Sequence, residues 1–369
     1  MLITKKECLA LRQTSVADCS YLDCAVLIYQ SGPGFDVIGV ALSIWLELQV
    51  TIDKSFEACR TPLNCSITYE SYSGNDSVSL VADDNLITRT ALYVLRCCGQ
   101  RCFPANTHVH IKNAIPLGRG LGSSGAAVVA GVMLANEVGK LDLDKARMLD
   151  YCLMIERHPD NVAAALYGGF VGTYLNELDP EETERKEIPL SEVLPEPAGG
   201  IDTGHNPPEP PRNIGHYEKF ALADELKFIA VIPEFEVSTA SARQVLPETY
   251  TRKEVVFNLQ RIPLLLRALG KSPPSPETIY QAMQDRIHQP FRAQLIPGLS
   301  HILQNMTPKT HPGLCGICLS GAGPTILALA TANFDDIAQA ILEMFKQHNV
   351  ACNWKLLEPA VEGATVSIT

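Results

Sequence analysis

The sequence predicts an α+β fold in two domains. Helical and strand-like patterns follow one another without a strict strand–helix–strand rhythm, which argues against a doubly wound parallel sheet. The chain has 369 residues, about twice the usual length of one domain. Residues 196–216 are rich in proline and glycine and separate two more apolar parts. We therefore expect domains at 25–195 and 217–369, a surface insertion at 196–216, and an N-terminal segment without clear periodicity at 1–24.

Composition and charge exclude several classes of protein. Hydrophobic residues make up 46% of the chain and charged residues 19%, which suits packed cores and excludes a disordered chain. The net charge of −11 and the lack of a Lys/Arg block argue against a nucleic-acid platform. No apolar run approaches the roughly 18–20 residues of a membrane span. Because Cys97 and Cys98 are adjacent, most other cysteines lie in apolar runs and no signal peptide is visible, we expect free thiols and a cytoplasmic location.

The elements of the first domain follow from periodicity and chain breaks. Apolar and polar residues alternate at 40–51, as in a half-buried strand. The glycines and proline at 32–34 interrupt the chain before it. We also expect a strand at 24–30, a helix at 85–98, a strand at 108–114, a buried helix at 126–138, and a helix at 143–156 with Asp142 as its N-cap.

The second domain also consists of both predicted strands and predicted helices. Two apolar strands, at 315–319 and 325–330, flank a glycine-rich turn, and an amphipathic helix follows at 334–347. The other expected elements are a strand at 226–232, a capped helix start at 238–245, helices at 255–269 and within 279–295, and a last strand at 351–357.

A glycine–serine loop is the most informative segment for function. Its glycines let backbone N–H groups face a ligand closely, and the helix that follows directs its positive end at the loop. This combination suits the phosphates of a nucleotide, although a glycine-rich connection with packing duties alone stays open. The loop lacks the endings of a Walker loop and of a dinucleotide fingerprint. Its residues are Pro116, Leu117, Gly118, Arg119, Gly120, Leu121, Gly122, Ser123, Ser124 and Gly125.

Acidic and amide side chains crowd the turn that follows the helix at 143–156. Glu156, His158, Asp160 and Asn161 lie within six residues, and Pro159 prevents a simple continuation of the helix. A carboxylate beside a phosphate loop suits magnesium, which prefers oxygen ligands and nucleotide phosphates. A solvated carboxylate at a helix end is the alternative interpretation of Glu156.

Several short motifs stand in an order that resembles the GHMP small-molecule kinases, such as galactokinase and mevalonate kinase. The motifs are Gly-Pro-Gly-Phe-Asp at 32–36, the loop at 116–125, Glu-Arg-His-Pro-Asp-Asn-Val at 156–162 and Ser-Gly-Ala-Gly-Pro-Thr at 320–325. The first and third forms are similar to those of homoserine kinases in particular. So are Ser-Thr-Ala-Ser-Ala-Arg at 238–243 and Gln-Pro-Phe-Arg at 289–292.

The resemblance implies both a fold and an activity. The fold is the GHMP-kinase-like two-domain α+β fold. It pairs an N-terminal nucleotide-binding domain, similar to ribosomal protein S5 domain 2, with a C-terminal ferredoxin-like α/β domain. The implied activity is ATP- and Mg²⁺-dependent phosphorylation of the L-homoserine hydroxyl to O-phospho-L-homoserine, in threonine biosynthesis. L-Homoserine and ATP are the implied partners, with no nucleic acid or membrane, and a homodimer stays open.

The same resemblance implies roles for single residues. Glu156 is the implied magnesium ligand, with Ser123 sharing the ion or the phosphates, and Asn85 lies near the nucleotide. Asn161 and Arg243 are expected at the reacting groups. Asn161 cannot take up a proton, whereas relatives of the mevalonate kinase type have an aspartate there, so we expect it to orient the hydroxyl. The residues expected to bind homoserine are Asp36 for its ammonium group, Arg243 and Arg292 for its carboxylate, and Thr239, His158 and Gln30.

Gln30 marks a departure from the family pattern. Homoserine kinases have an asparagine that contacts substrate at this point, just before the Gly-Pro-Gly-Phe-Asp motif. Two explanations stay open: Gln30 substitutes as a longer amide, or residues 1–31 are not the authentic start of the gene product. Two other functions also stay open, a GHMP kinase for a different alcohol such as mevalonate or a sugar, and a non-catalytic ligand sensor on the same fold.

Overall fold

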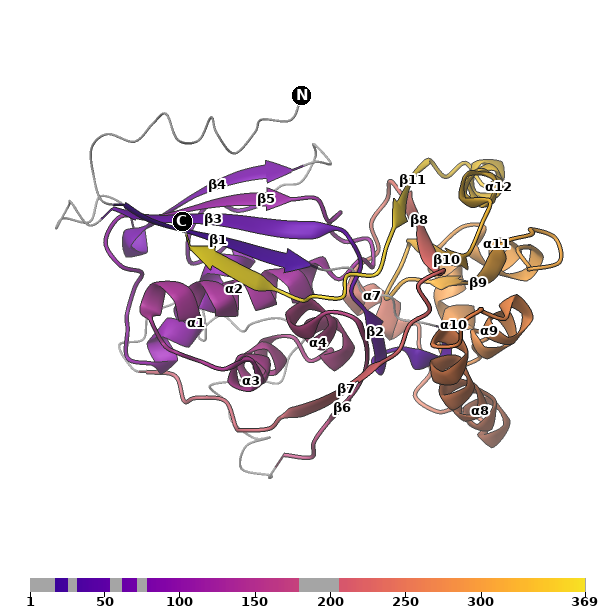
Figure 1. Cartoon of the computed structure of the whole chain (residues 1–369), viewed down its shortest axis with the longest axis horizontal. Helices are drawn as coiled ribbons and strands as arrows, with labels where there is room; N and C mark the ends of the chain where they lie inside the picture. Colours follow the sequence, from indigo (N-terminus) through magenta and orange to yellow (C-terminus); the bar gives the residue numbers. More distant parts are fainter. Residues whose placement is uncertain (1–16, 26–31, 54–61, 72–77, 179–205, 369) are drawn as a thin grey trace.

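The computed structural model describes residues 17–25, 32–53, 62–71, 78–178 and 206–368. They form two lobes that lie side by side (Figure 1). The first lobe has a five-stranded sheet in the order β12-β1-β3-β5-β4. Its strands are β1 (Ala17–Ala25), β3 (Trp45–Asp53), β4 (Cys65–Ser71), β5 (Thr107–Asn113) and β12 (Thr365–Ile368).

Helices cover one face of this sheet (Figure 1). They are α1 (Leu86–Cys97), α2 (Ser123–Gly139), α3 (Lys145–Ile155) and α4 (Pro159–Tyr167). On β3, Leu46, Leu48 and Val50 are buried while Glu47 is exposed, so the predicted alternation sets which side of the strand meets the helices. A second, three-stranded sheet joins β2 (Ile38–Val40), β6 (Phe170–Leu175) and β7 (Gly215–Phe220).

The second lobe has a four-stranded antiparallel sheet, in the order β11-β8-β10-β9. Its strands are β8 (Lys227–Pro233), β9 (Leu314–Leu319), β10 (Ile326–Ala330) and β11 (Cys352–Leu357). Every residue of β9 and β10 is buried, since alternate side chains enter two different cores. The helices of this lobe are α7 (Thr239–Gln244), α8 (Arg252–Leu269), α9 (Pro276–Ala282), α10 (Gln289–Arg292), α11 (Leu299–Asn305) and α12 (Phe334–Gln347).

The antiparallel sheets confirm the α+β prediction, and several details differ from the sequence-based expectations. The expected strand at 40–51 is divided, because Val40 ends β2 and β3 begins at Trp45. In the connection at 41–44, Leu42 is buried and makes an isolated bridge to Pro359. The helix cap expected at Asp142 is wrong: Asp144 caps α3 by accepting the Arg147 N–H at 2.7 Å. The first strand ends at Ala25, and the rest of the expected strand at 24–30 lies outside the described residues.

The last strand of the chain lies in the first lobe. β12 returns to the first lobe and pairs antiparallel with β1, as Figure 1 shows, so the lobes are not simply consecutive in sequence. Cys65 and Cys315 are free and buried. Among the described residues, no helix is long and apolar enough to cross a membrane.

Candidate active site

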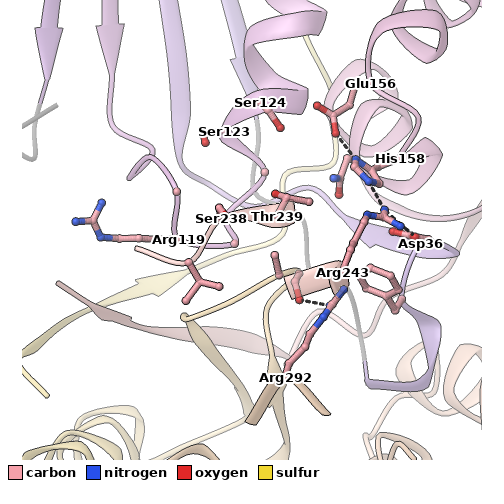
Figure 2. A pocket seen from close by; sticks show the side chains of 18 residues that line it. Asp36, Arg119, Ser123, Ser124, Glu156, His158, Ser238, Thr239, Arg243 and Arg292 are labelled. Atoms are coloured by element: carbon pink, nitrogen blue, oxygen red, sulfur yellow. Dashed lines mark hydrogen bonds and ion pairs between the residues drawn. The ribbon is translucent and has the colours of Figure 1, made fainter. Parts of the chain in front are cut away.

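A cavity between the two lobes collects most of the residues singled out from the sequence. The first lobe supplies the glycine–serine loop and the turn between α3 and α4, and the second lobe supplies α7, α10 and a glycine turn. Its lining residues are Phe35, Asp36, Gly118, Arg119, Gly120, Gly122, Ser123, Ser124, Glu156, His158, Asn161, Val237, Ser238, Thr239, Arg243, Arg292, Gly321 and Ala322. Figure 2 shows ten of them labelled.

The glycine–serine loop has the backbone that its sequence predicts. Gly118, Gly120 and Gly122 have φ values of 64°, 69° and 69°, a region that favours glycine. At Gly120 a Cβ atom would lie 2.3 Å from the Ser320 carbonyl oxygen, so the loop packs directly on the second lobe. The Ser320 hydroxyl donates to the Gly120 carbonyl at 2.8 Å, and the Val237 N–H donates to the Gly118 carbonyl at 3.2 Å.

The start of α2 directs N–H groups toward this cavity. Gly122 occupies the N-cap position and supplies no side-chain cap to the first turn of a 17-residue helix. The unpaired N–H groups and the helix dipole therefore favour an anion here. Ser123 and Ser124 add hydroxyl groups at the same place. By contrast, the Leu121 side chain is buried in the core, so it can act only through its backbone.

Arg119 connects the loop to the second lobe. Its guanidinium donates to the carbonyl oxygens of Pro233 at 3.1 Å and Glu234 at 2.8 Å, and it lies 3.4 Å from the Glu236 carboxylate. In Figure 2 this side chain points away from the other labelled groups. The role that the structure suggests for the Arg119 side chain is therefore to hold the loop, rather than to contact the phosphates.

The turn between α3 and α4 places a carboxylate and an imidazole in contact. Glu156 ends α3, and Pro159 is the first residue of α4, a position that tolerates proline. Glu156 and His158 are 3% and 6% exposed, and Nδ1 of His158 contacts Oε1 of Glu156. Burial opposes the charged imidazolium, but the hydrogen bond and charge of Glu156 raise the pKa of His158 above its ordinary value.

Arg243 extends this chain of contacts to Asp36. Its Nη2 lies against Nε2 of His158 and donates to Oδ2 of Asp36 at 3.2 Å (Figure 2). The other carboxylate oxygen of Asp36, Oδ1, is buried and has no hydrogen-bond partner in the described part of the chain. Asp36 has a φ of 59°, so the turn after Gly32–Gly34 aims its side chain from a left-handed backbone.

Arg292 is fully buried and packs against Phe35. Its Nε and Nη1 donate to the carbonyl oxygens of Ala242 at 3.2 Å and Gly321 at 2.8 Å. Nη2 is buried and has no hydrogen-bond partner among the described residues. The guanidinium stacks 3.9 Å from the Phe35 ring centroid. Burial lowers the pKa of Arg292 to about 10, so the group stays charged at neutral pH.

A second cavity adjoins the loop and is more apolar. Leu117, Ser123 and Ser124 line it from the loop, and Leu46, Tyr69 and Leu86 are among its other lining residues. Asn85 lines it as well, but its side chain caps α1 by accepting the Ile87 N–H at 3.0 Å. Sequence reasoning missed Phe35, Val237 and Tyr69, because aromatic and aliphatic residues carry no chemical signal that separates a site from a core. Gln30 lies outside the described residues.

Comparisons with known proteins show the family to which the chain belongs. The chain is 60% identical over 338 residues to the homoserine kinase of Saccharomyces cerevisiae, covering 91% of this chain and 95% of the relative. The chain belongs to the homoserine kinase family. The homoserine kinase of Candida albicans is 52% identical over 91% of this chain and 94% of its own length. Residues 85–169 match the description "GHMP kinases N terminal domain".

Solved structures show the same GHMP-kinase fold. The homoserine kinase of Cytophaga hutchinsonii superposes with a TM-score of 0.70 at 23% identity, covering 97% of this chain and all of that chain. A putative homoserine kinase of Listeria monocytogenes has a TM-score of 0.62 at 26% identity, covering 94% of this chain and 99% of its own. The expected GHMP-kinase-like fold of this homoserine kinase family member is thus confirmed.

Proposed function

We propose that this chain transfers the γ-phosphoryl group of ATP to the side-chain hydroxyl of L-homoserine, giving O-phospho-L-homoserine and ADP. The observation that carries the proposal is the pairing of two kinds of recognition in one cavity. The glycine loop, which suits an anion, lines the same cavity as Asp36 and Arg292, and one carboxylate oxygen of Asp36 and one guanidinium nitrogen of Arg292 have no hydrogen-bond partner among the described residues. The names of the relatives, all homoserine kinases, favour this substrate over mevalonate or a sugar.

The nucleotide would bind with its phosphates at the glycine loop and its nucleoside in the adjoining cavity. The positive end of α2 and the Ser123 and Ser124 hydroxyls would hold the phosphates. Because both serines line both cavities, one nucleotide can occupy the two at once. Asn85 would shape the nucleoside cavity by fixing the start of α1.

Magnesium fits the oxygen groups at this place. The buried carboxylate of Glu156 and the hydroxyl of Ser123 line the same cavity as the loop. No group of three or more His, Cys, Asp or Glu side chains that could hold a metal occurs among the described residues, so the protein alone offers few ligands. That suits Mg²⁺, which keeps waters and takes substrate phosphates. When bound, the ion would neutralise charge on the transferring phosphoryl group.

Homoserine would be held by its two charges. Asp36 would accept the ammonium group, while Arg243 and Arg292 would donate to the carboxylate and Thr239 would line the same end of the pocket. Arg243 is bonded to Asp36 in the structure, so a zwitterion can replace each partner of this pair with one of its own charges. A substrate with a single charge can replace only one.

Phosphoryl transfer would rest on positioning. Asn161 lies in the first turn of α4, where its N–H bonds the His158 carbonyl at 3.1 Å and its side chain lines the cavity. Its amide would orient the homoserine hydroxyl toward the γ-phosphorus. The new O–P bond forms as the bond to the β-phosphate oxygen breaks, and the hydroxyl proton leaves to phosphate or solvent. Buried Asp160 would hold the turn. The cytoplasmic location and the homodimer stay predictions.

A substrate-screened assay tests the proposal. The purified chain is supplied with ATP, Mg²⁺ and either homoserine, mevalonate or galactose, and the products are measured by mass spectrometry. We expect O-phosphohomoserine and ADP in equal amounts. Glu156→Gln, which keeps the size of the side chain, should lose Mg²⁺-dependent turnover at a temperature at which the variant is still folded. Faster turnover of mevalonate or galactose would refute the homoserine assignment, and nucleotide binding without any product would favour a sensor.

A further inference from the structure

A short helix of the second lobe and its N-cap residue contact three segments that line the proposed homoserine site: the Gly-Pro-Gly-Phe-Asp loop, α7 and the glycine turn. This helix is α10, with His288 as its N-cap position. The buried Asp285 carboxylate fixes its start by accepting the N–H groups of His288 at 3.0 Å and Gln289 at 2.7 Å. Arg292, at its other end, bonds the carbonyls of Ala242 and Gly321. The buried guanidinium of Arg292 therefore holds α7 and the glycine turn next to each other.

His288 reaches from this helix to the Gly-Pro-Gly-Phe-Asp loop of the first lobe. Its Nε2 contacts the carbonyl oxygen of Gly32, a residue 256 positions away in sequence. Because a carbonyl only accepts, Nε2 must carry the proton and donate. The side chain is 2% exposed, and Nδ1 has no partner among the described residues, as expected for an imidazole protonated on Nε2 alone. The Asp285 carboxylate lies 3.8 Å from Nε2 and favours this proton.

Two further contacts hold the same loop on the second lobe, one with α10 and its N-cap residue and one with the end of α9. The Phe35 ring packs against His288, with ring centroids 5.1 Å apart, and against the Arg292 guanidinium, which lies 3.9 Å from the ring centroid. A Cβ atom on Gly32 would lie 2.2 Å from the Met283 carbonyl oxygen, so the loop backbone rests directly on the second lobe. Asp36 follows Phe35 directly. The place of its carboxylate therefore depends on how firmly the loop is held at Gly32 and Phe35.

We propose that His288 is a positioning residue for the amino-acid substrate, setting the distance between Asp36 and the arginines without touching the substrate itself. The proposal rests on the homoserine function proposed above. The phosphate loop is held separately, by Ser320 and Val237, and none of those contacts involves His288. Loss of the His288–Gly32 bond should therefore weaken homoserine binding and leave nucleotide binding unchanged.

His288→Met and His288→Gln form a matched pair for the test. Both side chains are unbranched and similar in length, but only glutamine can donate to Gly32 from the place of Nε2. We expect His288→Met to raise the homoserine KM about 10-fold, with the ATP KM within about 2-fold of the wild type. The homoserine KM of His288→Gln should lie within about 3-fold of the wild-type value. Equal homoserine KM values for the two variants, or equal increases in both KM values, would overturn the proposal.

Separate readouts distinguish this inference from the function on which it rests. A wild-type chain that does not phosphorylate homoserine would defeat the proposed function. An active wild type with indistinguishable Met and Gln variants would defeat the positioning role alone. If His288→Met does not fold, His288→Asn replaces it, because its amide takes the place of Nδ1 and falls short of Gly32. A result in which only His288→Gln folds would make the bond structural and would also overturn the proposal.

Discussion

The two halves of the cavity recognise charge in different ways. The phosphate half is one continuous loop that offers backbone N–H groups, three left-handed glycines and a helix start. The homoserine half consists of single side chains from separate segments: Asp36 from a turn, Arg243 from α7 and Arg292 from α10. The backbone half can hold an anion in a chain whose net charge is −11, because local dipoles and N–H groups act at short range.

The difference shows what each half depends on. The phosphate half depends on local backbone conformation and on close packing against Ser320. The homoserine half depends on long-range tertiary contacts that bring one carboxylate and two guanidinium groups around Phe35. Changes in one half should therefore alter the binding of one substrate only.

The largest effect is expected at Arg243. Arg243→Ala removes a carboxylate ligand and leaves Asp36 without its ion-pair partner. Truncating one partner of a partly buried charge pair costs about 2–5 kcal/mol, so kcat/KM for homoserine should fall about 1,000-fold. Steady-state kinetics should show an ATP KM within about 3-fold of the wild-type value. Arg267→Ala, on the exposed end of α8, is the control and should change neither value. An equal rise in both KM values would mean that Arg243 serves both halves.

A glycine substitution perturbs the other half. Gly120→Ala places a Cβ atom 2.3 Å from the Ser320 carbonyl oxygen, at a φ of 69°. Overpacking and left-handed strain each cost about 1–3 kcal/mol, so nucleotide affinity should fall about 100-fold. At Gly118, the three atoms nearest to an added Cβ all belong to the Glu236 side chain, the first at 3.0 Å, and this side chain is exposed and can move. Gly118→Ala should therefore reduce nucleotide affinity less than Gly120→Ala does, as measured by nucleotide titration. An equal loss of affinity in the two variants would contradict the packing difference between the two glycines.

Substrate analogues sharpen the comparison from the ligand side. An alcohol that lacks the ammonium group leaves Asp36 bound to Arg243, and one that lacks the carboxylate leaves Arg292 Nη2 unpaired. A hydrogen bond to a charged group contributes about 1.5–3 kcal/mol, so each analogue should show a kcat/KM about 10- to 100-fold below that of homoserine. Competition assays with 4-hydroxybutyrate and 3-aminopropanol measure this. An analogue that equals homoserine would show that one of the two charges is not recognised.

The smallest effect concerns pH and His158. Its pKa is raised in the folded chain, so its stabilising contribution is fully present below the unfolded pKa and is lost as pH rises through the folded pKa. The melting temperature of the wild type should therefore exceed that of His158→Asn by more at about pH 6 than at about pH 9. Thermal unfolding across this range is the measurement. A difference that grows with pH would show that the neutral imidazole is the form that the fold favours.

The phosphate half could be predicted from sequence because its cause is local. A run of glycines and serines before an apolar helix predicts left-handed backbone and a helix start without a side-chain cap. Gly118, Gly120 and Gly122 have left-handed φ values, and Gly122 is the uncapped start of α2. The same holds for α12, whose predicted limits at 334–347 are those observed. In the turn at 156–161, Pro159 predicted the end of α3 but not the new helix that it begins.

The homoserine half was less predictable, because its geometry comes from contacts across the lobes. The resemblance to homoserine kinases predicted that Asp36, Arg243 and Arg292 bind the charged groups of the substrate, but it did not predict how they are arranged. Neither the bond between Asp36 and Arg243 nor the contact of both arginines with the Phe35 ring has a local signal. The return of β12 to β1 has none either, since 342 positions separate a contact such as Asp23 with Thr365, and only tertiary packing determines it.

Cross-titration of two variants tests the division between the halves most directly. Isothermal titration measures the dissociation constants of homoserine and of a non-hydrolysable ATP analogue with Mg²⁺, for wild type, Arg243→Ala and Gly120→Ala. We predict that Arg243→Ala loses homoserine binding and retains the nucleotide, whereas Gly120→Ala loses the nucleotide and retains homoserine. If each variant lost both ligands to the same extent, the cavity would act as one unit, and the division into two independent halves would be contradicted.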